Sequence, residues 1–325
     1  MGARITGTGS FLPEQMLTND ELAERVETSD EWIVQRTGIR SRHLLRDDEL
    51  PSDMGVIAGH RALEDAKTSP GDVDLLLVAT NFPDMICPGS APFIAEGLNL
   101  GSTPFFDLKA GCTGFVYGLA VADGLVRSGL FPRVLLIGTE ALSRVTDWDD
   151  RRTCVLFGDA AGAVLLETGD DRTGVLGSAL FGDPEKTELL HMPGGGSRSP
   201  ATAESVAAGD HFIKMEGSGV FRHAVPMMEG ATRAALRNAG LTLEDVDWII
   251  PHQANARIVN SLIKRLDANP EQVIVNLDRV ANTSAASIPV ALDEARRDGR
   301  INEGDIVAMT AFGAGVTYGA VVARL

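Results

Sequence analysis

Cysteine is scarce in this chain of 325 residues: only three occur, an odd number spaced far apart. Such cysteines make no disulfide framework, so we expect a reducing compartment in which cysteine is a free thiol. Basic residues are also few, 29 against 45 acidic ones, which argues against a general nucleic-acid-binding protein. Long apolar runs and a hydrophobic signal core are both absent from the sequence. We therefore expect a cytoplasmic protein with no membrane span.

Apolar material is plentiful, with 44% hydrophobic residues against 23% charged ones. This balance is typical of a globular chain with a large core, and the length suits two packed halves. Short apolar runs that suit buried strands alternate with longer helical stretches, which predicts an α/β fold. We expect strands at 75–79, 134–137, 163–166, 248–250, 273–275 and 306–309, and helices at 52–67, 113–128, 217–238 and 288–298.

A weak internal repeat suggests how the halves are related. The runs at 62–66 and 72–74 recur at 235–239 and 245–247, both at an offset of 173 residues. Chance likeness between α/β segments is the alternative, but the conserved spacing favours duplication. We predict two similar halves, 1–172 and 173–325, related by a pseudo-twofold axis with a site where they meet. The segment 182–209, rich in glycine, proline and serine, is either a functional loop or a solvated surface excursion.

Cys112 has the surroundings of a nucleophile. The run FFDLKAGCTGF places it after an apolar strand and directly before a helix with one apolar face. Its neighbouring glycines allow a sharp turn. The helix N-terminus favours thiolate, and free backbone N–H groups there can bind an oxyanion. A buried structural cysteine is the alternative, and Cys87 and Cys154 lack this setting.

His252 lies just beyond the apolar strand that ends at Pro251. Reacting groups of α/β sheets gather at the carboxyl ends of strands, so His252 is a candidate catalytic residue. A hydrogen-bonded loop histidine is the alternative. The other five histidines show no metal-ligand spacing, so we expect no metal site.

Asn282 lies in the second half, close to the position that matches Cys112. At an offset of 172 residues, Cys112 corresponds to Ser284. The duplication therefore predicts that Cys112 and Asn282 face one junction, although a helix N-cap is an alternative role for this asparagine. The glycine-rich segment 311–319 offers a further backbone donor or forms a simple hairpin.

With their flanking motifs, these residues resemble the β-ketoacyl-acyl-carrier-protein synthase III family of the thiolase superfamily. The Cys-His-Asn set differs from the Cys-His-His of the elongating synthases, and no second cysteine follows Cys154, as a thiolase would require. Papain-like proteases share the order Cys, His, Asn, but their signature around the cysteine is missing. The resemblance covers nearly the whole chain, through TSDEWIVQRTGIR (28–40), AGCTGF (110–115), FGDAAGA (157–163), KMEG (214–217), HQAN (252–255), NTS (282–284) and FGAG (312–315).

The resemblance implies a five-layered αβαβα duplicated fold and a homodimer. It implies condensation of an acyl-CoA primer with malonyl-acyl-carrier protein, the first step of fatty-acid synthesis, without a metal or other cofactor. Cys112 would accept the acyl group, while His252 and Asn282 would polarise the malonyl thioester during decarboxylation. Phe312 would pack beside the malonyl carboxylate, with backbone support from Gly313 and Ala314.

The same resemblance implies residues for substrate binding. Trp32 and Arg151 would sandwich the CoA adenine, and Arg36 and Asn255 would hold the phosphates and the pantetheine arm. The primer pocket would be lined by Leu142 and Phe157 and by Cys87, which reaches across the dimer into the partner's pocket. Because cysteine is moderately small, we predict that primers longer than acetyl are tolerated.

A basic helix face suggests a protein partner. No acidic residue occurs from 248 to 266, although the chain carries a net charge of −16. Arg257, Lys264 and Arg265 share one helical face, which Arg222 and Arg233 extend, and an acidic carrier protein would dock there. An ordinary solvated helix face is the alternative.

Two residues depart from the family pattern. Lys109 stands where a small or uncharged residue is usual, and a cation there would favour thiolate if it pointed at the cysteine. Ala314 replaces a glycine, which the fold tolerates unless the backbone requires a positive φ. Two other functions stay open: a specialised synthase-III-like enzyme of secondary metabolism, and a catalytically silent acyl-CoA-binding homologue.

Overall fold

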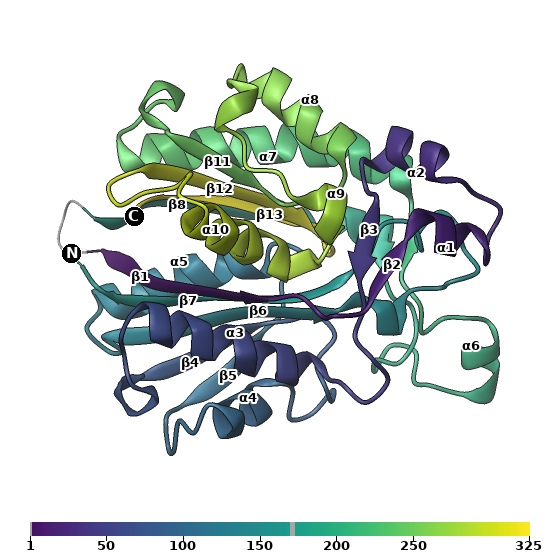
Figure 1. The fold of residues 1–325 in the computed structure, drawn as a ribbon, viewed down its shortest axis with the longest axis horizontal. Helices are drawn as coiled ribbons and strands as arrows, with labels where there is room; N and C mark the ends of the chain where they lie inside the picture. The colour runs from purple at the N-terminus through teal and green to yellow at the C-terminus, as the bar shows by residue number, and fades with distance from the viewer. Residues whose placement is uncertain (1, 170–172) are drawn as a thin grey trace.

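The two larger β-sheets of the described residues alternate with three layers of helices (Figure 1). The computed structural model describes residues 2–169 and 173–325. From one outer face to the other, the layers are α7 and α8, one sheet, α5 and α10, the second sheet, and α3 and α4. This order is the αβαβα arrangement, and it confirms the α/β class predicted from the sequence.

The first sheet has five strands in the order β1-β7-β6-β4-β5. β4 is parallel to both of its neighbours, whereas β7 is antiparallel to both of its own. The continuous apolar run of β4 is buried along its whole length, as expected for a strand covered on both faces. The bounds are β1 Ala3–Phe11, β4 Leu75–Ala79, β5 Phe105–Leu108, β6 Arg133–Ala141 and β7 Asp159–Thr168.

The second sheet has the order β11-β12-β13-β8, with β11 and β12 parallel and the other pairs antiparallel. The strand expected at 273–275 is wrong: only one isolated bridge joins Val273 to Ile249. The chain leaves a 3₁₀ turn at Pro270–Gln272 and soon enters α9, so Val275 is 41% exposed and pairs with no strand. The bounds are β8 Gly174–Gly182, β11 Trp248–Pro251, β12 Ile306–Gly313 and β13 Thr317–Arg324.

The helices predicted from periodicity are all present, with ends within two residues of the expected ones. α5 and α10 are packed between the sheets. Their residues Phe115 and Ile288 belong to one buried cluster that also contains side chains from strands of both sheets. α7 and α8 cover the outer face of the second sheet, and α3 and α4 cover the outer face of the first (Figure 1). The bounds are α3 Pro51–Asp65, α4 Ala91–Gly97, α5 Gly114–Arg127, α7 Gly217–Ala239, α8 Ala256–Leu266 and α10 Ser287–Arg297.

Smaller elements form one end of the molecule, near the site. β2 (Met16–Thr18) and β3 (Ser41–His43) pair antiparallel. Between them in the sequence lie α1 (Asn19–Ala23) and α2 (Asp30–Thr37). The segment 182–209 contains β9 (Leu190–His191) and α6 (Ala203–Ala207), and β9 pairs with β10 (Lys214–Met215). The short α9 (Leu277–Val280) precedes Asn282.

The chain changes sheets between Thr168, the end of β7, and Gly174, the start of β8. The boundary predicted between residues 172 and 173 adjoins residues 170–172, which lie outside the described residues. The division into two repeated halves therefore stays a prediction. Among the helices of the described residues, none is long and apolar enough to cross a membrane.

Candidate active site

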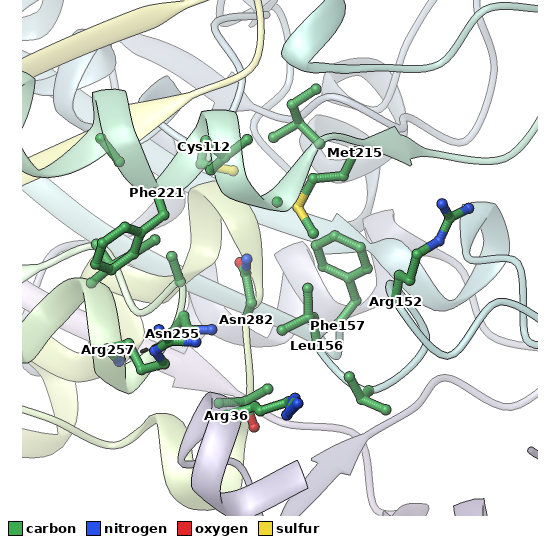
Figure 2. A pocket seen from close by; sticks show the side chains of 18 of the residues that line it. Arg36, Cys112, Arg152, Leu156, Phe157, Met215, Phe221, Asn255, Arg257 and Asn282 are labelled. Atoms are coloured by element: carbon green, nitrogen blue, oxygen red, sulfur yellow. Dashed lines mark hydrogen bonds between the residues drawn. The ribbon is translucent and has the colours of Figure 1, made fainter. Parts of the chain in front are cut away.

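The three candidate catalytic residues line one cavity of about 480 Å³, which we name the front cavity. Cys112 comes from the turn between β5 and α5, His252 from the end of β11 and Asn282 from the loop after α9. Phe312, near the end of β12, lines the same space. In Figure 2 the Asn282 side chain projects into the cavity, with Cys112 toward one side and Arg36 at the opposite side. Cys112 and Asn282 thus face one cavity, as the sequence analysis expected.

A second cavity of about 280 Å³, the rear cavity, adjoins the front cavity at Cys112. Both cavities are also lined by Phe157 and Leu190. The rear cavity has the predicted Leu142 in its wall, together with the segment from Leu190 to Gly196. Part of the 182–209 segment thus forms the site rather than a solvated excursion.

The cysteine turn is held against the hairpin between β12 and β13. Gly111 has φ +59°, and a Cβ atom at this position would lie 2.5 Å from the Ala314 nitrogen. The Thr317 hydroxyl donates to the Ala110 carbonyl at 2.7 Å. Gly313 packs directly against the backbone of Cys112. Ala314 is not among the residues with positive φ in the described chain, so alanine fits there in place of the family's glycine.

Burial raises the pKa of the Cys112 thiol to about 12. The Ser284 hydroxyl lowers this pKa and the charge of Glu140 raises it further. The helix whose N-terminus the sequence analysis invoked, α5, begins at Gly114, two residues after Cys112. The ammonium group of Lys109 lies 5.9 Å from the centre of the Phe82 ring, and both residues line the rear cavity.

His252 is a neutral imidazole at physiological pH, because burial lowers its pKa to about 4. Its Nδ1 atom lies 2.7 Å from the Ser287 hydroxyl, which also accepts a long hydrogen bond from the Gln253 backbone N–H. A hydroxyl that accepts from Gln253 can donate to Nδ1, which leaves the ring proton on Nε2.

Asn282 is buried, and its amide has a fixed orientation. The Oδ1 atom accepts a hydrogen bond of 2.9 Å from the Ser284 backbone N–H. The amide nitrogen, Nδ2, is therefore the atom left to face a ligand in the front cavity. Asn282 is not the N-cap of a following α-helix: the next element is a 3₁₀ turn capped by Thr283.

Glu140 is a buried acid near Cys112 that our sequence analysis did not identify. It lies in β6, is 0% exposed, and accepts hydrogen bonds from Asn81 and Ser284. Burial outweighs these bonds and raises the pKa of Glu140 to about 7. The available signal was an acidic residue close behind the apolar run 134–137, within a strand that is otherwise uncharged from 134 to 141.

The raised pKa of Glu140 predicts a pH-dependent stability. As the pH rises, the unfolded chain loses the Glu140 proton before the folded protein does. The contribution of protonated Glu140 to the free energy of unfolding is therefore fully present below pH 4.5 and is lost as the pH rises through about 7. The difference of 2.5 pKa units corresponds to about 3 kcal/mol. Relative to wild type, Glu140→Gln should therefore gain up to about 3 kcal/mol of unfolding free energy over this range.

Denaturant unfolding of both proteins at successive pH values measures this difference, and a constant difference would refute the prediction. His252→Gln provides a control of opposite sign. The lowered pKa of His252 makes the wild type lose stability as the pH falls from 6.5 through about 4. Removing that imidazole should therefore raise the free energy of unfolding, relative to wild type, at the acid end of the range.

The residues expected to bind CoA line the mouth of the front cavity. Arg36 and Arg151 place their guanidinium carbons 4.4 and 5.2 Å from the centre of the Trp32 ring. An adenine sandwiched by Trp32 and Arg151 would therefore replace a direct contact between them. Asn255 caps α8 through its side chain, which accepts from the Arg257 backbone N–H at 2.8 Å. Further lining residues that the sequence did not single out include Arg152, Met215 and Phe221 (Figure 2).

Most of the other expected residues lie outside the two cavities, and only Arg257 lines the front one. Cys87 is exposed and lines neither of them. Arg222 and Lys264 are exposed on the surface, and Arg257 is exposed at the cavity mouth. Arg265 is partly neutralised by Glu229, whose carboxylate lies 2.6 Å away. Within residues 2–169 and 173–325, no group of three or more histidine, cysteine or acidic side chains is arranged to hold a metal ion.

Comparison with known proteins agrees with this geometry. The family described as 3-oxoacyl-[acyl-carrier-protein (ACP)] synthase III matches residues 106–184, and its C-terminal part matches residues 236–325. A β-ketoacyl-[acyl-carrier-protein] synthase III of Desulfitobacterium hafniense is 50% identical over 98% of this chain and 97% of its own.

Solved structures of this kind superpose over almost the whole chain. The 3-oxoacyl-[acyl-carrier-protein] synthase III of Aquifex aeolicus has a TM-score of 0.92 at 41% identity and covers 100% of both chains. The priming β-ketosynthase of the R1128 polyketide pathway has a TM-score of 0.92 at 36% identity, covering 99% of this chain and 96% of its own. The chain therefore belongs to the β-ketoacyl-acyl-carrier-protein synthase III family of acyltransferase-type condensing enzymes.

Proposed function

We propose that the protein joins an acyl-CoA primer to malonyl-acyl-carrier protein, giving β-ketoacyl-acyl-carrier protein, CO₂ and CoA. The observation that carries this proposal is the convergence of Cys112, His252 and Asn282 on one cavity, with an apolar cavity beyond the sulfur. The chemistry requires no metal and no cofactor, since CoA enters and leaves as part of a substrate.

In the first half-reaction, the Cys112 sulfur attacks the carbonyl carbon of the acyl-CoA thioester. The bond to the CoA sulfur breaks, CoA leaves with the thiol proton, and the acyl chain extends into the rear cavity. Covalent capture divides the condensation into two easier steps.

In the second half-reaction, malonyl-acyl-carrier protein occupies the front cavity and loses CO₂. The electrons of the broken C–C bond form a thioester enolate, whose oxygen accepts hydrogen bonds from His252 Nε2 and Asn282 Nδ2. Two neutral donors stabilise this charge without transferring a proton. The enolate carbon then attacks the acyl-cysteine carbonyl, the C–S bond breaks, and the Cys112 thiolate takes up a proton from solvent.

Intact-protein mass spectrometry of the wild type tests this proposal. The protein is mixed with acetyl-, butyryl- or octanoyl-CoA and then with malonyl-acyl-carrier protein. We expect an acyl adduct that clears as β-ketoacyl-carrier protein forms, and acylation by primers longer than acetyl. An adduct that clears only with a different acceptor would indicate a specialised enzyme, and no adduct from any primer would indicate a silent acyl-CoA-binding protein.

The carrier protein is expected to dock on the basic surface formed by Arg222, Arg257 and Lys264, beside the mouth of the front cavity. Lys264→Glu should lower kcat/KM for malonyl-acyl-carrier protein by about tenfold at low salt, because charge complementarity accelerates association. Acylation by acyl-CoA should change little. Lys67→Glu, directly after α3 on the opposite outer face, is the matched control, and an equal loss in both variants would contradict this docking site.

We also propose that two copies of the chain pair through the edge of the first sheet. β5 is the end strand of that sheet in the described residues, and Phe105 and Phe106 on it are 44% and 43% exposed. The nearby Ile86 is 88% exposed in the loop that carries Cys87. An edge strand with exposed apolar side chains is stabilised by pairing with a second copy. Sedimentation analysis should give the mass of a dimer.

A further inference from the structure

Glu140 is a wholly buried carboxyl group that has no role in the reaction proposed above. Its Oε2 atom accepts from the Asn81 backbone N–H at 3.1 Å. Its Oε1 atom accepts from the Asn81 side-chain amide and, at 2.9 Å, from the Ser284 hydroxyl. A buried carboxyl group is costly unless donors surround it, so this cluster of donors must be maintained for the fold to be stable.

Ser284 connects Glu140 to the catalytic asparagine. Its backbone has φ +49°, a left-handed conformation that non-glycine residues adopt only when their surroundings impose it. In this conformation its N–H donates to Asn282 Oδ1 at 2.9 Å. Its hydroxyl donates to Glu140 and also accepts from the Asn81 side-chain amide, so Glu140 holds it both directly and through Asn81.

Asn81 extends the same cluster to the cysteine turn. Besides its bond to Glu140, its amide nitrogen lies 3.1 Å from the Gly111 carbonyl and 3.2 Å from the Ser284 hydroxyl. The carboxyl group in β6 therefore links residues that precede Cys112 with residues that follow Asn282. Those two segments are far apart in the sequence and meet only in the folded protein.

We propose that Glu140 is a positioning residue for decarboxylation: by holding Ser284 in its left-handed conformation, it aims the Asn282 amide nitrogen into the front cavity. Glu140 touches no substrate and acts through Ser284. This role rests on the proposed function, because it matters only if Asn282 donates to the malonyl thioester.

Glu140→Gln tests the proposal because it preserves the shape of the side chain and replaces one acceptor oxygen by a donor. Asp159→Asn is the matched control. Asp159 is also 0% exposed and accepts from the Leu45 and Ser143 backbone N–H groups at 2.8 Å, but none of its donors contacts Asn282. Both variants replace a buried carboxyl group, and only Glu140→Gln alters the support of the Asn282 side chain through Ser284. Asp159 adjoins Gly158, whose backbone N–H donates to the Asn282 carbonyl at 3.1 Å, and that bond involves no side chain.

Two rates are measured in each variant: acyl-Cys112 formation from acyl-CoA, and CO₂ release from malonyl-acyl-carrier protein. In Glu140→Gln, the rate of CO₂ release should fall by about 10- to 100-fold, since small displacements of a catalytic group cost this much. Acylation serves only to show that the site is folded, because removing the Glu140 charge lowers the pKa of the Cys112 thiol and so alters acylation by itself. In Asp159→Asn the rate of CO₂ release should stay near the wild-type value. If CO₂ release changes in both variants, or in neither, Glu140 has no positioning role.

Ser284→Ala gives a second test that does not depend on the folding of Glu140→Gln. Its rate of CO₂ release is compared directly with that of the wild type, because the Ser284 hydroxyl also lowers the pKa of the Cys112 thiol and its loss changes acylation. CO₂ release should fall, and it should fall no further in the double variant than in Glu140→Gln, because the two side chains act through one hydrogen bond. Additive effects would overturn the proposal. If the wild type itself forms no acyl-cysteine or releases no CO₂, the proposed function is wrong. If it does both and the variants leave CO₂ release unchanged, only the role of Glu140 is wrong.

Discussion

Cys112→Ala is expected to form no acyl adduct with any acyl-CoA and to lose condensation by at least about 1,000-fold, because the covalent intermediate cannot form. The variant should still bind acyl-CoA in the front cavity. It should also still release CO₂ from malonyl-acyl-carrier protein, since His252 and Asn282 are unchanged. Intact-mass measurement and CO₂ release, run on the same preparation, check both halves of this expectation.

The control is Cys154→Ala. Cys154 is 0% exposed in a cluster of apolar side chains, and burial raises its pKa to about 11. It is therefore a packing residue, and its removal should leave the adduct in place. An adduct that survives in Cys112→Ala and disappears in Cys154→Ala would show that Cys154, and not Cys112, is the nucleophile.

Asn282→Asp is the second variant with a large expected effect. Aspartate has the size of asparagine but lacks the N–H donor, and it adds negative charge beside a developing oxyanion. Loss of one such donor typically costs about 10²- to 10³-fold in rate. This loss should appear in CO₂ release and condensation, while the rate of acyl-Cys112 formation stays within about threefold of wild type.

Single-turnover measurement of the two half-reactions separates these effects. Asn282→Ala removes the donor without adding a charge, so its loss should be smaller than that of the aspartate variant. An equal loss in acylation and decarboxylation would mean that Asn282 shapes the cavity in general rather than stabilising the enolate.

Much of the fold could be predicted because its signals are local. The buried strand β4 and the helices α5 and α7 follow from apolar runs and helical periodicity. The segment 273–275 was misassigned for the same reason. Its alternating valine and isoleucine favour a strand, but whether a strand forms depends on a partner that the sequence does not specify locally.

The candidate catalytic residues could be predicted from motifs, whereas their electrostatics could not. The position of Cys112 before a helix suggested a thiolate, but the pKa of a thiol depends on how fully the folded protein encloses it. Glu140 and Ser284 were missed as a pair because 144 residues separate them in the chain. Likewise, the sequence showed that Arg265 lies on a basic face but not that Glu229 neutralises it.

The front and rear cavities share the walls formed by Cys112, Phe157 and Leu190, which has a consequence for the timing of the proposed reaction. In that reaction both thioesters react beside Cys112 in the front cavity, so we expect them to occupy it in turn. Free CoA, the first product, would then compete for this space with the second reactant and slow its entry. The alternation of the two reactants would follow from the shape of the site.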